Sequence, residues 1–485
     1  MKSTYKIALL LFLCGFAFQS CQDNDDVATG PNDIEIQNFI WKGLNQYYLW
    51  QPDVPNLDEK KYASQDELNI FLKGFPVPEE LFQSLLNKPS SLYPDPTQAI
   101  DRFSWIVSDY LELEGQLQGT TKNNGIDFGL SLVSNDSDDV YGYVRYIIPN
   151  SDAATKNILR GEVFYAVNGT KLTRSNYSNL LFGSSESYTL NFATISTDAS
   201  SNTVVTPNGK SIDLTKTVLN ENPILINKII NEGSHKIGYL MYNGFFSNYD
   251  SQLNNAFGSL IGVTDLVLDL RYNGGGSVNT ATQLASMITG QFKGQTFSKL
   301  KWNDKNSDNN TNYQFVDPAS INSLNLTTVY VLTSKSTASA SEMIINGLKP
   351  YIKVVQIGDL TYGKNVASRT LYDSPTFGSS NRNPNHRYAM QPIVAHIVNS
   401  VNFGDYLGGL TPDYLLKEKI STLGILGDRD EPLLSTAIGK ITGTGRMIKQ
   451  NKEKGIEYFT DSKALNHQNQ MYIENTTESI LKDLD

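Results

Sequence analysis

The sequence predicts a multidomain α+β protein with a helical N-terminal region, a β domain and an α/β core. Three observations lead to this prediction. A chain of 485 residues is longer than one ordinary hydrophobic core accommodates. The spacing of its apolar residues changes from helical to alternating near Gly125. From Lys236 onward, short apolar strands alternate with helical segments, which is the pattern of an α/β domain.

The first twenty residues have the composition of an export signal. Lys2 and Lys6 precede an apolar run over residues 7–18, which is too short and wrongly flanked for a membrane-spanning helix. We therefore expect residues 1–20 to be a signal peptide that is removed.

The end of this signal resembles the cleavage box of bacterial lipoproteins. It reads Phe18-Gln19-Ser20-Cys21, and Cys21 would become the lipidated N-terminus of an acidic tether over residues 21–33. The acidic run 23–26 resembles export tags of surface lipoproteins in some Gram-negative bacteria, although a solvated tether has the same composition. We expect a cell-envelope protein that is lipid-anchored to the outer membrane of a Gram-negative bacterium and displayed on its surface. The alternative is an ordinary secretory signal with an incidental cysteine.

A helical N-terminal region is expected over residues 34–118. Apolar side chains recur at helical spacing near its start, at positions 36, 39, 40, 44 and 47. Segments 79–86 and 100–113 have the same pattern, and prolines divide the region into short helices.

A β domain is expected over residues 119–200, followed by a β connection over 201–235. Residues 140–148 and 161–167 alternate like strands, and Asn168-Gly169 is a hairpin-type turn.

The α/β core is expected over residues 236–440. It contains four short apolar strand candidates, at 237–242, 265–270, 328–332 and 354–357, and helix candidates at 279–288 and 341–348. Residues 291–324 read as a polar insertion. The charged tail, residues 441–485, reads as a helix packed on the surface.

Charge and composition exclude several partners. The formal net charge is −10, whereas a nucleic-acid-binding protein needs a basic surface. The four histidines have no metal-ligand spacing, so we expect neither a metal nor a cofactor.

A serine-rich turn is the first candidate for chemistry. Thr337-Ala338-Ser339-Ala340-Ser341-Glu342 lies between an expected strand and an expected helix, where free backbone N–H groups can stabilise an oxyanion. The alternative interpretation needs no chemistry, because Ser339 and Glu342 also have the spacing of a helix capping box.

Lys364 is the second candidate. A lysine that burial keeps neutral can take the proton of a serine hydroxyl, and its pKa must then fall by about three units from about 10.4. We expect apolar residues nearby to supply that burial, at positions 354, 355, 357 and 366. Residues 358–365 also come close to a phosphate-binding loop, but Asn365 replaces the hydroxyl that would bind magnesium. An exposed loop lysine is the remaining alternative.

Three motifs together resemble the C-terminal processing (tail-specific) peptidase family. They are the turn around Ser339, the segment Thr361-Tyr362-Gly363-Lys364, and the segment Leu268-Asp269-Leu270-Arg271-Tyr272-Asn273-Gly274-Gly275-Gly276. The resemblance implies a ClpP/crotonase-like core in which Ser339 is the nucleophile and Lys364 the base. Backbone N–H groups of Ala340 and Gly275 would hold the oxyanion.

The third member of this catalytic set is open. Some members of the family have an aspartate at the position of Pro350, and others have a glutamine at the position of Ser368. We take Ser368 as a possible third member, although a dyad would suffice.

The β domain resembles a PDZ module. Its carboxylate-binding loop would be Phe128-Gly129-Leu130-Ser131-Leu132, which would bind a peptide that adds as a strand. The alternative is a β domain that only gates the active site.

These observations predict a lipid-anchored serine endopeptidase of the cell envelope with a Ser339–Lys364 dyad. Its substrate would be unfolded or C-terminally presented polypeptide, and the number of subunits is left open. The alternative is a non-catalytic peptide-binding or chaperone-like lipoprotein on the same scaffold.

Overall fold

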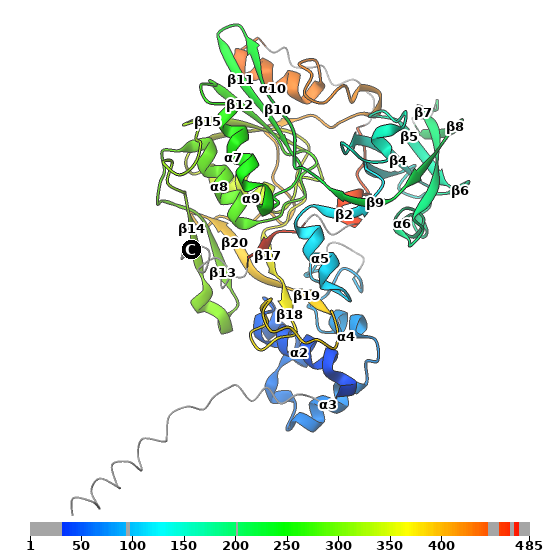
Figure 1. Cartoon of the computed structure of the whole chain (residues 1–485), viewed down its shortest axis with the longest axis vertical. Helices are drawn as coiled ribbons and strands as arrows, with labels where there is room; N and C mark the ends of the chain where they lie inside the picture. The colour runs from blue at the N-terminus through cyan, green and yellow to red at the C-terminus, as the bar shows by residue number, and fades with distance from the viewer. Residues whose placement is uncertain (1–31, 94–97, 200–201, 445–454, 466–469, 475–485) are drawn as a thin grey trace, which may run out of the picture.

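A computed structural model describes residues 32–93, 98–199, 202–444, 455–465 and 470–474 (Figure 1). The expected signal, Cys21 and most of the tether lie outside the described residues. In the described part of the chain, no helix is long and apolar enough to cross a membrane. The fold is a mixed α/β arrangement with N-terminal helices, as the sequence predicts.

The N-terminal region is a small helical layer at the lower end of the molecule (Figure 1). Its helices are α2 (Glu35–Tyr47), α3 (Gln65–Lys73) and α4 (Pro78–Ser84). Phe39, Ile40 and Leu44 of α2 are buried together, so the helical spacing in the sequence corresponds to a real apolar face.

The prediction of a helix over residues 100–113 is wrong. The segment contains strand β1 (Trp105–Val107), and helix α5 (Tyr110–Leu117) begins only after it. The Asp101 carboxylate accepts the backbone N–H groups of Phe103 and Ser104, both at 2.9 Å, and so forms a turn where a helix was expected. β1 then pairs with β19 (Ala389–Gln391), which also pairs with β18 (Leu371–Tyr372).

The β domain is one antiparallel sheet with strand order β22-β3-β4-β5-β7-β8. Its strands are β3 (Ile126–Leu132), β4 (Val140–Ile147), β5 (Val163–Val167), β7 (Ser187–Thr197), β8 (Thr203–Thr215) and β22 (Thr460–Asp461), with β6 (Thr170–Lys171) beside β5 and helix α6 (Tyr177–Phe182). The sheet thus runs past the boundary expected at residue 200. Pro207 and Gly209 inside β8 made this strand resemble a connection.

A two-stranded link joins this domain to the core. β2 (Thr120–Asn123) pairs with β9 (Thr217–Asn220), and β10 (Ile224–Glu232) then enters the core sheet. Most of the connection expected over residues 201–235 is therefore strand.

The main core sheet has the order β10-β11-β12-β15-β16-β21. β11 (His235–Tyr242), β12 (Asp265–Asp269), β15 (Thr328–Thr333), β16 (Lys353–Gly358) and β21 (Tyr414–Leu415) are parallel neighbours. All four strands expected from the sequence are present, because each is a short apolar run buried on both faces.

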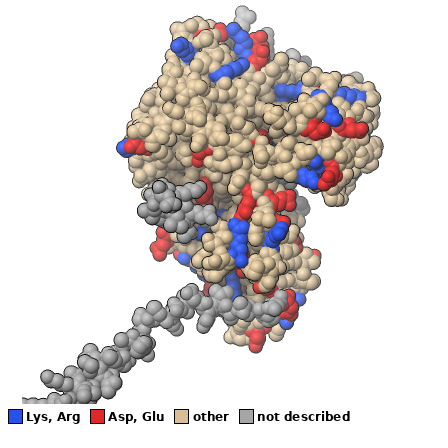
Figure 2. All heavy atoms as spheres, viewed as in Figure 1, with Lys and Arg blue, Asp and Glu red and all other residues tan. Residues whose placement is uncertain are grey.

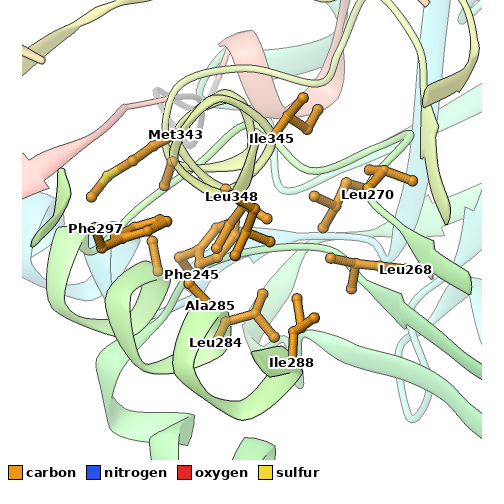
Figure 3. Packing of buried hydrophobic residues seen from close by; sticks show 14 of the residues in the cluster. Phe245, Leu268, Leu270, Leu284, Ala285, Ile288, Phe297, Met343, Ile345 and Leu348 are labelled. Atoms are coloured by element: carbon orange, nitrogen blue, oxygen red, sulfur yellow. The ribbon is translucent and has the colours of Figure 1, made fainter. Parts of the chain in front are cut away.

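Helices cover both faces of this sheet. α7 (Asp250–Ser259), α8 (Val278–Thr289) and α9 (Ala340–Leu348) share one apolar cluster, and α10 (Pro432–Thr442) packs in a separate cluster with other side chains of the same strands. Figure 3 shows Ile345 and Leu348 of α9 in the same buried cluster as Leu268 and Leu270. This packing holds α9 against the sheet beside β12.

The segment expected as a polar insertion builds a second core sheet. β13 (Thr296–Trp302) and β14 (Thr311–Gln314) lie in the order β14-β13-β20-β17-β23, with β17 (Val366–Arg369), β20 (Ile393–Asn399) and β23 (Tyr472–Ile473). The sequence did not indicate these strands, because β13 buries the polar Ser298 between Phe297 and Leu300 and β14 is mostly exposed, so neither strand alternates clearly between apolar and polar residues.

The described parts of the tail differ from the expected surface helix. Residues 455–465 and 470–474 contribute β22, a four-residue helix α11 (Ser462–Leu465) and β23, and they lie within two sheets. Asp461 is buried against Arg145, with 3.1 Å between Oδ2 and Nη1. The charges that suggested a solvent-facing helix are paired inside the protein.

The visible surface carries both signs of charge. Figure 2 shows acidic and basic side chains interspersed on one face, without a continuous basic field on that face.

Candidate active site

Ser339 sits in a strained turn between β15 and α9. Its backbone φ is +67°, a region that residues other than glycine rarely adopt, and its side chain is fully buried. Ala340 is the first residue of α9, so its N–H has no acceptor within the helix. The Ser339 hydroxyl therefore lies at the positive end of a helix, beside a backbone donor.

Gly275 lies directly against this turn. Its φ is +120°, and a Cβ atom at this position would stand 3.2 Å from Ser339 Oγ and 3.1 Å from the Ala340 nitrogen. Only glycine permits this approach. The Gly275 N–H itself donates to Asn273 Oδ1 at 2.9 Å, so this donor is engaged within its own loop.

The Glu342 carboxylate ties the serine turn to the lysine turn. It accepts the N–H groups of Ser339 (2.8 Å), Gly363 (2.7 Å) and Lys364 (2.8 Å), and the hydroxyl of Thr361 (2.5 Å). Burial raises the pKa of this carboxyl, while the four donors oppose that shift. The sequence suggested only the cap on Ser339, because the contacts to residues 361–364 cross about twenty residues of chain.

We predict that Glu342→Gln lowers kcat by about 100-fold with little change in KM, because the amide presents N–H groups to backbone donors. The Glu342 charge also favours protonated Lys364. Its loss should therefore move the acidic limb of the pH–rate profile to lower pH. A purely structural role would lower the melting temperature and leave that midpoint in place. Glu342→Asp, which keeps the charge, is the matched control.

Lys364 is fully buried, and burial lowers the pKa of its amine to about 7. Its Nζ lies 4.8 Å from the centre of the Phe103 ring. Asp101 and Glu342 oppose the shift, and Arg102 adds to it. The neutral amine is therefore abundant at mildly alkaline pH.

The expected surroundings of Lys364 are only partly right. Val366 shares an apolar cluster with Phe103, whereas residues 354, 355 and 357 pack in other clusters. Phe103 comes from a segment some 260 residues away, which Arg102 fixes by donating to the Gly363 carbonyl at 2.7 Å. No spacing or periodicity in the sequence connects Arg102 and Phe103 with Lys364.

Burial of Lys364 predicts a pH-dependent stability. Because its pKa is lowered, between about pH 7 and pH 10.5 the unfolded chain binds a proton that the folded chain does not, so stability rises with pH in this window. We predict that Lys364→Met stabilises the protein by about 2–4 kcal/mol at pH 7 or below. The gain should shrink toward pH 10, as measured by chemical denaturation across this range. A gain independent of pH would contradict the lowered pKa.

The structure contains neither a hydrogen bond between Ser339 and Lys364 nor one between Ser368 and Lys364. Lys364 Nζ donates to Gln470 Oε1, and Ser339 Oγ has no hydrogen-bond partner within the described residues. Ser368 is buried beside them, but its hydroxyl donates to the Met471 carbonyl at 3.0 Å. Ser339, Lys364 and Ser368 are thus all buried in one region. The side chains of Lys364 and Ser368 donate hydrogen bonds to the C-terminal segment.

The five residues expected as a carboxylate-binding loop form strand β3 instead. Phe128, Gly129, Leu130, Ser131 and Leu132 pair with β4 on one side. On the other side, Leu130 and Gly129 pair with Thr460 and Asp461 of β22. Because β3 ends the sheet apart from this partner, its outer edge is an acceptor site for an added strand.

Comparison with known proteins agrees with the arrangement of these motifs. Residues 236–388 match the family model for peptidase family S41, and residues 35–105 match the peptidase S41 N-terminal domain. A solved structure assigned as an S41 protease of Bacteroides fragilis is 29% identical, with a TM-score of 0.63 over 84% of this chain and 98% of its own. The photosystem II D1 C-terminal processing protease shares the fold at 20% identity, with a TM-score of 0.51 over 84% of this chain and 98% of its own.

The curated relatives match a shorter part of the chain. The probable CtpA-like serine protease of Staphylococcus epidermidis is 29% identical over 141 residues, which are 29% of this chain and 27% of that protein. These relatives come from Gram-positive Staphylococcus, so they do not support the expected Gram-negative outer membrane. The family models and the protease structures support a serine-type peptidase. The chain therefore contains a domain of peptidase family S41 over residues 236–388 and an S41 N-terminal domain over residues 35–105.

Proposed function

We propose that this protein is a serine endopeptidase in which Ser339 is the nucleophile and Lys364 the general base. The observation that carries the proposal is the Glu342 carboxylate, which fixes the backbones of Ser339 and Lys364 with one group. A lysine with a pKa of about 7 supplies a base near neutral pH without a histidine.

The proposed reaction follows from these positions. Neutral Lys364 accepts the Ser339 proton while Oγ attacks the carbonyl carbon of a peptide bond. The oxyanion accepts the Ala340 N–H, and the Gly275 N–H once Asn273 releases it. The C–N bond then breaks as Lys364 returns the proton to the leaving amine. Water, deprotonated by Lys364, hydrolyses the acyl-enzyme and restores Ser339.

Two strand edges support the proposed substrate class. An extended polypeptide can pair with β17 beside Lys364 and with the outer edge of β3, which supports a PDZ-like role for the β domain. Both contacts use backbone groups, so they favour unfolded or terminal segments over folded domains. Ser368, whose N–H lies on β17, would bind the substrate backbone or act as a third member of the catalytic set.

Degradation of casein by the chain from residue 22 onward tests the proposal, because this chain keeps every described residue. Fragments that appear with time support a peptidase. The missing hydrogen bond between Ser339 and Lys364 favours the second candidate, a non-catalytic peptide-binding protein. Stable binding of peptides without cleavage at any pH from 6 to 10 would establish that candidate.

We also propose that Cys21 carries a lipid that anchors the protein in the cell envelope, on the outer membrane if the host is Gram-negative. The support is the lipoprotein-like box before Cys21. Incorporation of labelled palmitate should be lost in Cys21→Ser, which should also leave the membrane fraction. A labelled Cys21→Ser protein would contradict the anchor.

A further inference from the structure

We propose that the C-terminal segment of this chain, residues 457–463 and 470–474, is an intramolecular ligand that occupies both peptide-binding edges and holds the peptidase inactive. The inference deepens the proposed function, on which its regulatory part rests. The occupation of the two edges can be tested separately.

The first part of the segment occupies the edge of β3. Thr460 pairs with Leu130 and Asp461 with Gly129 in antiparallel register, and the Phe459 N–H donates to the Leu130 carbonyl at 3.0 Å. The Ser131 hydroxyl donates to the Glu457 carbonyl at 2.6 Å. This is the backbone pairing with which an added peptide strand would bind.

Buried charges anchor this first part next to the serine turn. Asp461 Oδ2 lies 3.1 Å from Arg145 Nη1 and accepts the Ser336 hydroxyl at 2.6 Å, three residues before Ser339. Lys463 is buried and donates to the Asn243 carbonyl at 2.6 Å. Both residues also line a small cavity with Gly274 and Ala338, so the segment forms a wall of the space beside the site.

The second part lies between the glycine loop and β17. Tyr472 pairs in parallel with Ser368, whose N–H donates to the Met471 carbonyl at 3.0 Å. On the opposite side, the Tyr472 N–H donates to the Gly276 carbonyl at 3.1 Å. An extended chain held on both sides by backbone bonds, with Met471 fully buried, occupies the place of a substrate strand.

This occupation removes the two conditions that catalysis needs. With the segment bound, Ser339 and Lys364 have no exposed surface, so no external peptide reaches them. The Lys364 amine donates to Gln470 Oε1 of the segment, and Ser339 Oγ is left without a partner among the described residues. An enzyme whose base, Lys364, is hydrogen-bonded to the segment and whose nucleophile, Ser339, is covered is inactive.

The contacts of both parts of the segment are suited to release. β22 and β23 contain two residues each, which is short for an independent strand. One carboxylate oxygen of Glu474 accepts the Ser277 hydroxyl, whereas the other, Oε2, is buried without a hydrogen-bond partner in the described structure. A buried polar atom left unpaired weakens the bound state. Substrate can therefore compete with the segment.

The test uses Tyr472→Pro, which removes the N–H that binds Gly276. Tyr472→Phe keeps this N–H and the ring and is the matched control. In a Ser339→Ala background, a fluorescent peptide of residues 455–474 should bind Tyr472→Pro at least tenfold more tightly than Tyr472→Phe. With Ser339 present, Tyr472→Pro should degrade casein at least fivefold faster than Tyr472→Phe.

The two readouts separate the proposals. If casein is cut by no variant, the proposed function fails, and peptide binding alone decides whether the edges were occupied. Equal peptide binding and equal cleavage by folded Tyr472→Pro and Tyr472→Phe would overturn the inference and make the segment a permanent part of the fold. If Tyr472→Pro unfolds, Gln470→Ala, which frees the Lys364 amine, is judged by the same two thresholds.

Discussion

Replacement of Ser339 by alanine is expected to lower kcat on casein by at least about 1,000-fold, because the attacking oxygen is removed. The protein should stay folded. Ser339 Oγ has no hydrogen-bond partner in the described structure, so its removal breaks no hydrogen bond. Alanine is slightly smaller than serine and fits at the N-terminus of α9 without disturbing the packing around it. The melting temperature should therefore change little while the activity disappears.

Ser341→Ala is the matched control for this experiment. Ser341 lies in the same turn and is equally buried, but its hydroxyl donates to the Asn273 carbonyl at 3.0 Å. We expect this variant to keep its activity within about tenfold, since it loses one positioning hydrogen bond. Equal losses in both variants would mean that the turn, and not the Ser339 oxygen, determines the rate.

Replacement of Lys364 by methionine is expected to have the second largest effect, a fall in kcat of at least about 1,000-fold. Methionine fills the apolar space beside Phe103 but cannot accept a proton. In the unmodified protein, the rate should rise with pH and reach half its maximum near the lysine pKa of about 7, because only the neutral amine is a base.

Lys335→Met controls for the loss of a nearby positive charge. Lys335 is half-buried near the same turn, and burial lowers the pKa of its amine as well. This variant should keep its rate within about tenfold and keep the pH midpoint, since Lys335 has no place in the proposed proton transfer. A pH–rate profile that is unchanged in Lys364→Met would contradict the dyad.

The arrangement of the core could be predicted from the sequence because its elements are local. Each parallel strand is one short apolar run, and α8 and α9 follow strands with helical spacing. The proximity of Gly275 and Ser339 also follows from topology, since β12 and β15 are parallel neighbours and both loops leave the same end of the sheet.

The environment of Lys364 could not be predicted in this way. Phe103 and Asp101 come from the N-terminal region, and Gln470 lies 106 residues further along the chain. No period or spacing indicates contacts at such separations. Asp101 also organises its own turn by accepting two backbone N–H groups, so a segment with helical spacing became a strand.

The C-terminal segment was predicted least well. Its charges predicted a solvent-facing helix, but Asp461 and Lys463 are buried beside Arg145 and Glu221. A charged residue indicates a surface position only when the fold offers it no buried partner of opposite charge. Here the partners, Arg145 in β4 and Glu221 directly after β9, lie more than 200 residues earlier in the chain.

Covalent labelling of the nucleophile tests the central claim most directly. A fluorophosphonate should modify Ser339, and mass spectrometry identifies the modified residue. In the full chain, the rate of modification should rise with pH around 7. Tyr472→Pro should be modified faster than the unaltered chain. Lys364→Met should remain unlabelled over the same period. Labelling of another serine, or labelling of Ser339 at the same rate in Lys364→Met, would contradict the Ser339–Lys364 dyad.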